Sequence, residues 1–178
     1  MPLLALDPCR RIRTAMDDQP DSRTLRVTEP RAVPWLSIVF GYGPMLPFLA
    51  GAAVAWGWRG EALGDAALLL TLLWGSAILL FLSGVRRGLS FRTEGGATLA
   101  QIATMIGLFG LGFAALVLTT LDEVVAALVL LILGFGALTI LDPIAARRGE
   151  APLFFARLRP VQIPLAILGL GALLALKL

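Results

Sequence analysis

Five long runs of apolar residues, separated by shorter polar stretches, fill the chain beyond residue 34. An α-helix rises about 1.5 Å per residue, so crossing the hydrocarbon core of a bilayer takes roughly 20 apolar residues. The pattern predicts an all-α membrane protein, with a bundle of five transmembrane helices in residues 34–178. The last run is shorter than the others unless Pro160 also lies in the membrane. The predicted spans are residues 35–56, 66–85, 99–118, 124–141 and 161–176.

The arginines and lysines are distributed unevenly between the segments that connect these runs. Grouping alternate segments puts 13 basic residues on the side of the amino terminus and 2 on the other side. Basic residues are retained on the cytoplasmic side when membrane helices insert. The distribution therefore predicts a cytoplasmic amino terminus and a periplasmic carboxyl terminus.

Residues 1–33 differ in composition from the rest of the chain. They contain six arginines, five acidic residues and four prolines. Such a segment cannot bury enough apolar surface to offset the entropy lost on ordering. We expect a polar, mobile cytoplasmic arm, and the alternative is a docking arm that a partner orders.

Composition excludes several kinds of chemistry. The chain is 58% hydrophobic and 15% charged, which excludes an ordinary soluble domain. It has no histidine and a single cysteine, so imidazole metal ligation, serine–histidine or cysteine–histidine catalysis and an intrachain disulfide are excluded. We therefore expect no catalytic residue, no metal and no cofactor. We also expect no nucleic-acid partner, because membrane topology accounts for the basic residues.

The charged side chains in or next to the predicted spans all lie at the span ends. A charge at the centre of a membrane helix costs about 2.5–3.5 kcal/mol on insertion scales, so charges near spans are the first functional candidates. Arg86 and Asp142 close the second and fourth spans, which run in the same direction and end at the same interface. We predict a structural ion pair between them. The alternatives are anchoring of Arg86 among lipid headgroups and a role in substrate binding.

The first span contains Pro44 and Pro47, which predict a helix kink. These prolines could also leave carbonyl groups free inside the bundle, as a transport site would require. No span has a carboxylate or amide near its middle, however, which weakens a transport function.

Small residues predict faces where helices can approach closely. Four of them lie on the third span with spacings typical of such contacts. Two glycines flank Arg86 and leave room for a neighbouring helix. The predicted packing residues are Gly84, Gly88, Ala103, Gly107, Gly110 and Ala114.

The segment from Trp74 to Gly88 resembles the signature of a small membrane family known only as a domain of unknown function. That family has many proteobacterial members and an animal mitochondrial relative described simply as a transmembrane protein. Departures from its pattern are Leu80 for serine, Ser83 for glycine and Arg87 for tryptophan. The resemblance covers residues 34–176 and implies five helices in a bacterial or mitochondrial inner membrane, with no activity attached. The matching residues are Ile78, Leu79, Phe81, Leu82, Gly84, Val85, Arg86 and Gly88.

The absence of catalytic groups and the small-residue faces favour a protein that works by binding other proteins. We expect a non-enzymatic accessory subunit, stabiliser or assembly factor of a larger inner-membrane complex, respiratory or photosynthetic, in a bacterial plasma membrane. Its partners would be the lipid bilayer and other integral membrane proteins. The alternatives are a small-solute transporter or pore, and a lipid-modifying membrane enzyme.

Overall fold

The computed structural model describes residues 35–91 and 96–178, and every regular element in these ranges is helical. Five helices are long and apolar enough to cross a membrane, so the predicted all-α, five-span class is confirmed. The predicted arm, residues 1–33, lies outside the described residues. In chain order the elements are α2 (Trp35–Tyr42), η1 (Gly43–Met45), α3 (Leu46–Gly57), α4 (Ala62–Ser90), α5 (Leu99–Thr120), α6 (Val124–Arg147) and α7 (Phe155–Lys177).

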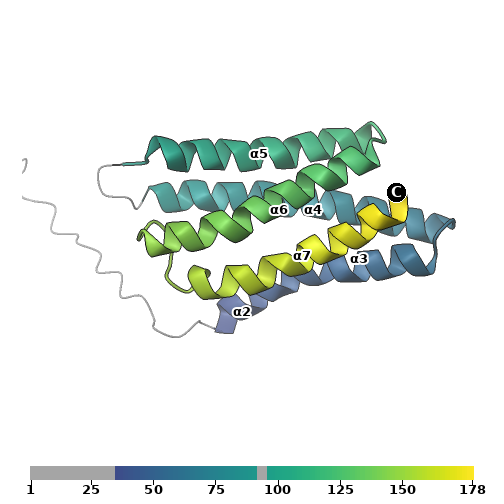
Figure 1. Ribbon diagram of the computed structural model, residues 1–178, viewed down its shortest axis with the longest axis horizontal. Helices are drawn as coiled ribbons and strands as arrows, with labels where there is room; N and C mark the ends of the chain where they lie inside the picture. The colour runs from purple at the N-terminus through teal and green to yellow at the C-terminus, as the bar shows by residue number, and fades with distance from the viewer. Residues whose placement is uncertain (1–34, 92–95) are drawn as a thin grey trace, which may run out of the picture.

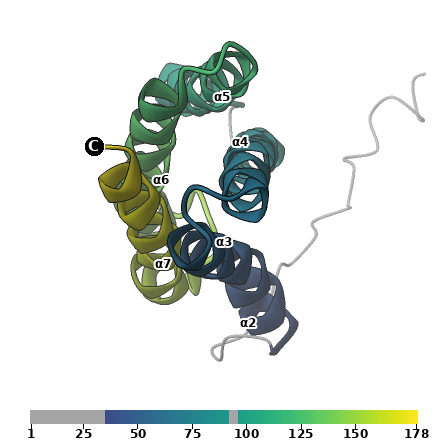
Figure 2. The same cartoon turned by 90° about the vertical axis from the view of Figure 1, so that its right-hand side faces the viewer.

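The helices run side by side along the long axis of the bundle (Figure 1). Viewed from the end, they form a ring in the order α3, α4, α5, α6, α7, with α7 returning to α3 (Figure 2). Apolar side chains fill the centre of this ring, and among them the Phe48 and Phe135 rings meet edge to face at 5.3 Å. The fold is thus held by a continuous apolar core to which all five spans contribute.

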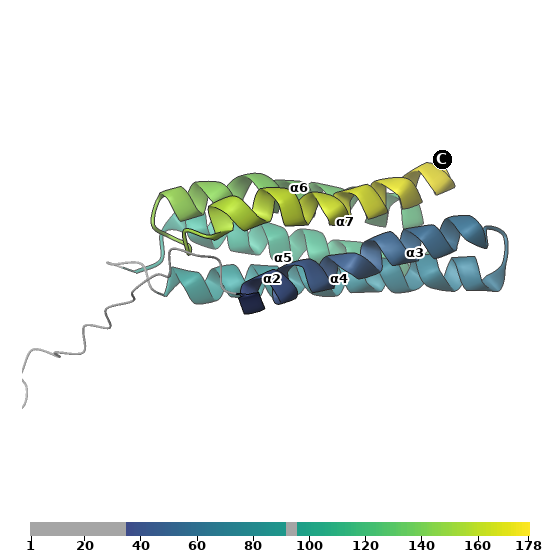
Figure 3. The ribbon, with the colours of Figure 1, turned by 90° about the horizontal axis from the view of Figure 1, so that it is seen from below.

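The two ends of the ring carry different groups. One end holds the end of α4, the start of α5, the end of α6 and the start of α7, and α2 begins nearer this end than the other (Figure 3). We call it the arginine end, because Arg86, Arg147, Arg148, Arg157 and Arg159 lie there. The opposite end holds the turn between α3 and α4 and the carboxyl terminus, and we call it the carboxyl-terminal end.

All five helical spans extend beyond the bounds that hydropathy predicts, and α4, α6 and α7 do so by at least about one helical turn. α4 reaches Ser90, α6 continues through Pro143 to Arg147, and α7 begins at Phe155. α7 has 23 residues and includes Pro160, which is the case in which the last span is not shorter than the others. The apolar pattern stops where charged residues begin, whereas backbone hydrogen bonding continues the helix into them.

The first span changes its hydrogen-bonding pattern at its prolines. Pro44 lies in the 3₁₀ turn η1, and Pro47 lies in the first turn of α3. A proline has no backbone N–H, so Pro47 cannot donate the 3₁₀ hydrogen bond to the Pro44 carbonyl. Instead the indole Nε1 of Trp74 on α4 donates to that oxygen at 2.9 Å. The prolines thus create a contact between the first and second spans, and the Pro44 carbonyl is not free.

Close approach of helices depends on glycines other than the predicted ones. A Cβ added at Gly134 would lie 2.3 Å from a methyl carbon of Leu79, and one at Gly169 would lie 2.5 Å from the Phe48 carbonyl oxygen. A side chain at Gly169 would therefore push α7 away from the α3 backbone, and one at Gly134 would displace the buried Leu79 side chain of α4.

The predicted packing residues face outward instead. A Cβ added at Gly84, Gly88, Gly107 or Gly110 meets nothing within 4 Å. Ala103 is exposed and Ala114 is half-buried. Within the described chain these glycines make no close approach to a neighbouring helix, so the contacts inside the bundle do not depend on them. Sequence spacing finds a flat strip on a helix, but in a span that is apolar all round it does not show which side faces the bundle.

Candidate functional site

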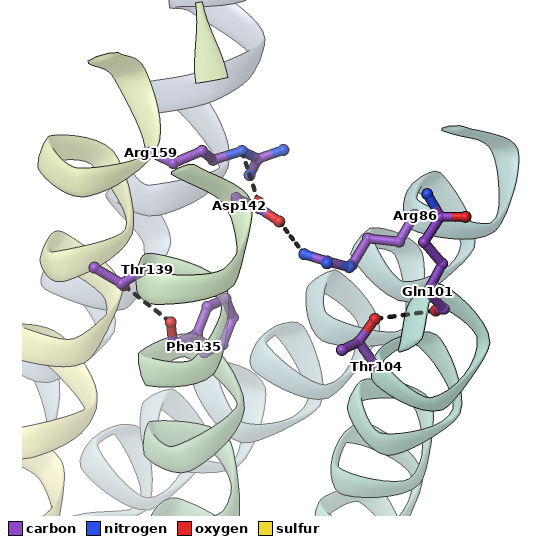
Figure 4. Close-up of polar contacts among 7 residues, drawn as sticks. All are labelled: Arg86, Gln101, Thr104, Phe135, Thr139, Asp142 and Arg159. Carbon is purple, nitrogen blue, oxygen red and sulfur yellow. Dashed lines mark hydrogen bonds and ion pairs between the residues drawn. The ribbon is translucent and has the colours of Figure 1, made fainter. Parts of the chain in front are cut away.

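A buried cluster of three charged side chains lies at the arginine end, and each comes from a different helix (Figure 4). Arg86 of α4 donates from Nη1 to Oδ1 of Asp142 on α6. The Nε of Arg159 on α7 lies 3.2 Å from Oδ2 of the same carboxylate. The side chains of Arg86, Asp142 and Arg159 are only 13%, 6% and 9% exposed. One carboxylate therefore connects three helices in a setting with little water.

The two arginines are held in different ways. Arg86 has both the ion pair and a hydrogen bond to Asp142. The Nε of Arg159 is close enough for an ion pair, but it lacks hydrogen-bond geometry and has no hydrogen-bond partner. The guanidinium of Arg159 also lies over the ring of Phe155, with its carbon 4.6 Å from the ring centroid. Phe155 is four residues earlier on α7, so the helix itself places the ring beside the cation.

The structure brings together Arg86 and Asp142, and it adds Arg159, which sequence reasoning counted only as a loop charge. Hydropathy begins the last span at Val161, which places Arg159 in the preceding loop. The helical period still carries a signal. Arg159 lies three and four residues before the buried Gln162 and Ile163, so it belongs to the inward face of α7 once the helix is extended.

Two cavities adjoin this cluster. A small one of about 20 Å³ lies beside Arg86 and Asp142, and its other polar lining residues are Ser90, Gln101 and Glu150. That volume is enough for about one water molecule. A larger one of about 190 Å³ lies between α2, η1, α4 and α7, and Arg159 and Gln162 supply its buried polar groups. The cluster thus has room for a small polar molecule on one side and for a larger group on the other.

The carboxyl-terminal end has weaker charge contacts. Lys177 lies 3.8 Å from Asp65, and both side chains reach solvent. Across the ranges 35–91 and 96–178, no three His, Cys, Asp or Glu side chains gather closely enough to hold a metal ion.

Comparison with known proteins identifies the family. A family model described as a protein of unknown function, DUF3429, matches residues 33–175. The chain belongs to the DUF3429 family. The resemblance to a small membrane family of unknown function, seen around residues 78–88, is therefore confirmed. All three members of the charged cluster lie inside the DUF3429 match. No curated protein and no solved structure matches the chain.

Proposed function

We propose that this chain is a non-enzymatic accessory subunit, stabiliser or assembly factor of a larger complex in a bacterial inner membrane, respiratory or photosynthetic. The observation that carries the proposal is an outward strip of small residues on α5. The strip consists of Ala103, Gly107, Gly110 and Ala114, whose spacing puts them on one side of the helix. Gly112, which approaches Leu80 of α4, lies on the opposite side.

The strip suits a partner helix. Small residues let two helices approach closely in lipid, where packing and interhelical contacts replace the hydrophobic effect as the cause of association. Phe109 and Phe113 are also exposed on α5, and their rings stack nearly parallel at 6.2 Å. A flat strip with large side chains on the same helix is a surface against which a second helix can pack.

The cytoplasmic placement of the arginine end belongs to the same proposal. The uneven distribution of basic residues supports it, because such residues are retained in the cytoplasm. In this orientation the partner would contact the middle part of α5, residues 103–114, between the cytoplasmic and periplasmic boundaries.

The alternative functions have less support. Phe48, Leu79 and Phe135 have no exposed surface and fill the centre of the ring, which leaves no polar route there for a solute. At the carboxyl-terminal end, Asp65 and Lys177 are solvent-exposed, and among the described residues no cluster of three metal-ligating side chains accompanies them for chemistry on a lipid.

Purification in mild detergent, followed by mass spectrometry of co-eluting proteins, tests the proposal. We expect a stoichiometric membrane-protein partner that is lost in the double variant Gly107→Leu/Gly110→Leu. Gly171→Leu on α7 is the matched control, because an added Cβ there also meets nothing within 4 Å. A clean monomer or self-oligomer in several detergents, or a partner that survives the α5 variant, would overturn the proposal.

A further inference from the structure

The larger cavity at the arginine end has the form of an amphiphile site. It lies between α2, η1, α4 and α7, and its volume is about 190 Å³. Apolar side chains line most of it, among them Phe40, Met45, Ile78 and Phe81. Phe40 and Phe81 are also largely exposed on the outside of the bundle. The cavity therefore opens towards the surroundings of the helices, which for membrane spans is lipid.

Two buried side chains in this cavity each have a polar atom without a hydrogen-bond partner. Gln162 is 2% exposed, and its Oε1 has no hydrogen-bond partner. Arg159 is almost as well buried, and its Nε also lacks one. A Cβ added at Gly41 would lie 2.9 Å from the Gln162 Oε1, so the glycine keeps space open beside this amide. Buried polar groups are normally hydrogen-bonded, and a ligand that fills the cavity would supply what is missing.

The net charge of the cluster indicates the sign of the charge that a ligand would carry. Arg86 and Arg159 share the single carboxylate of Asp142, which leaves one positive charge in excess. A buried charge without a counterion is unfavourable. A ligand with one negative charge would neutralise it.

The chemistry required is an anionic group beside a hydroxyl, attached to an apolar body. A phosphodiester accepts hydrogen bonds from Arg159, and a headgroup hydroxyl donates to the Gln162 Oε1. We propose that this cavity binds the headgroup of an anionic phospholipid of the phosphatidylglycerol type, with its phosphate at Arg159 and its glycerol hydroxyl at Gln162. The chains run out past Phe40 and Phe81, because the cavity holds only the headgroup and the first carbons. Its place at the helix ends, where basic pockets between spans bind anionic headgroups, agrees with this occupant.

Lipid titration of the delipidated protein in an uncharged detergent tests the site. Thermal unfolding and native mass spectrometry are measured with short-chain phosphatidylglycerol, with phosphatidylcholine of the same chains, and with glycerol 3-phosphate. We expect phosphatidylglycerol to raise the unfolding temperature and to bind as one molecule, because a ligand of the folded state stabilises it. An equal effect of phosphatidylcholine would overturn the proposal, and so would an equal effect of glycerol 3-phosphate, which would mean a free phosphate ligand.

Variants separate the site from general attraction between lipid and protein. Gln162→Leu removes the amide and leaves the charged cluster intact, and Arg159→Gln removes the cation. Arg159→Gln is expected to weaken phosphatidylglycerol binding at least about tenfold, as for a lost hydrogen bond to a charged group. Gln162→Leu is expected to weaken it by about threefold to tenfold, as for a lost hydrogen bond between neutral groups. Arg157→Gln is the matched control, because Arg157 is exposed on the same helix and does not line the cavity.

The control variant should bind as the original chain does. An equal loss in Arg157→Gln would mean non-specific charge attraction and overturn the proposal. Undiminished binding in Gln162→Leu would overturn it as well. That variant decides the question even if Arg159→Gln fails to fold, since it alters no charge.

Discussion

The two ends of the bundle each carry an ion pair between helices, but in opposite surroundings. At the arginine end Asp142 meets Arg86 and Arg159, and all three side chains are nearly buried. At the carboxyl-terminal end Lys177 meets Asp65 at 3.8 Å, with side chains 35% and 70% exposed. Water stabilises separated charges, so an exposed pair gains little, whereas a buried charge without its partner is costly. The same type of contact should therefore be structural at one end and nearly dispensable at the other.

The largest expected effect concerns which compartment each end faces. A reporter that is active only in the periplasm should be active when fused after Leu178. A reporter that is active only in the cytoplasm should be active when inserted within residues 93–98. The reason is the division of basic residues, 13 to 2, between the two sides. Activity of paired periplasmic and cytoplasmic reporters measures this. Cytoplasmic activity at Leu178 would reverse the assignment of the two ends.

Removing the carboxylate at the arginine end comes next. Asp142→Ala should lower the free energy of unfolding by about 3–5 kcal/mol, because it leaves two arginines buried without a counterion. Chemical unfolding in detergent measures the loss. Asp142→Asn is the control for side-chain shape, and it should lose a comparable amount because it also removes the charge. A change within the error of the measurement would show that the cluster is not structural.

Removing one arginine should cost less, because the other remains. Arg86→Ala should lower the free energy of unfolding by about 1.5–3 kcal/mol, the value for a hydrogen bond to a charged group. The double variant Arg86→Ala/Asp142→Ala should lose clearly less than the sum of the single losses, since the two residues interact. Simple additivity in this double-mutant cycle would mean that Arg86 and Asp142 do not pair, and Arg86 would then be a lipid-headgroup anchor.

The smallest effect is expected at the carboxyl-terminal end. Lys177→Ala should change the free energy of unfolding by less than about 1 kcal/mol. Added salt should reduce even this difference, because screening acts on exposed charges. Unfolding at low and high ionic strength measures it. A loss as large as that of Arg86→Ala would contradict the distinction between the two ends.

The number of helices could be predicted from the sequence because the thickness of the bilayer sets the length of each apolar run. Helix ends were harder, since α4 and α7 continue into charged residues that hydropathy assigns to loops. Arg86 and Asp142 could be paired because their spans run in the same direction. Arg159 could not be assigned to a span because hydropathy places the charged first turns of α7 in a loop.

Side-chain direction was the other limit. Gly107 and Gly134 look alike in an apolar run, yet one faces outward and the other touches Leu79. Gln162 lies near a span end in the sequence. In the structure it lies on the side of α7 that faces the bundle, and its Oε1 is buried. Only the packing of the helices shows which side chains face inward, because a span that is apolar on all sides has no hydrophobic periodicity in its sequence.

The closure of the ring by α7 against α3 has a consequence for biogenesis. Chains are synthesised from the amino terminus, so α7, which carries Arg159, joins the bundle after the spans that carry Arg86 and Asp142. The contact of Gly169 with the Phe48 carbonyl likewise waits for the last helix to be translated. A chain truncated before α7 would expose the face of α3 and leave the carboxylate half-paired. The ring therefore closes only when α7 packs against α3, and the same step completes the charge cluster.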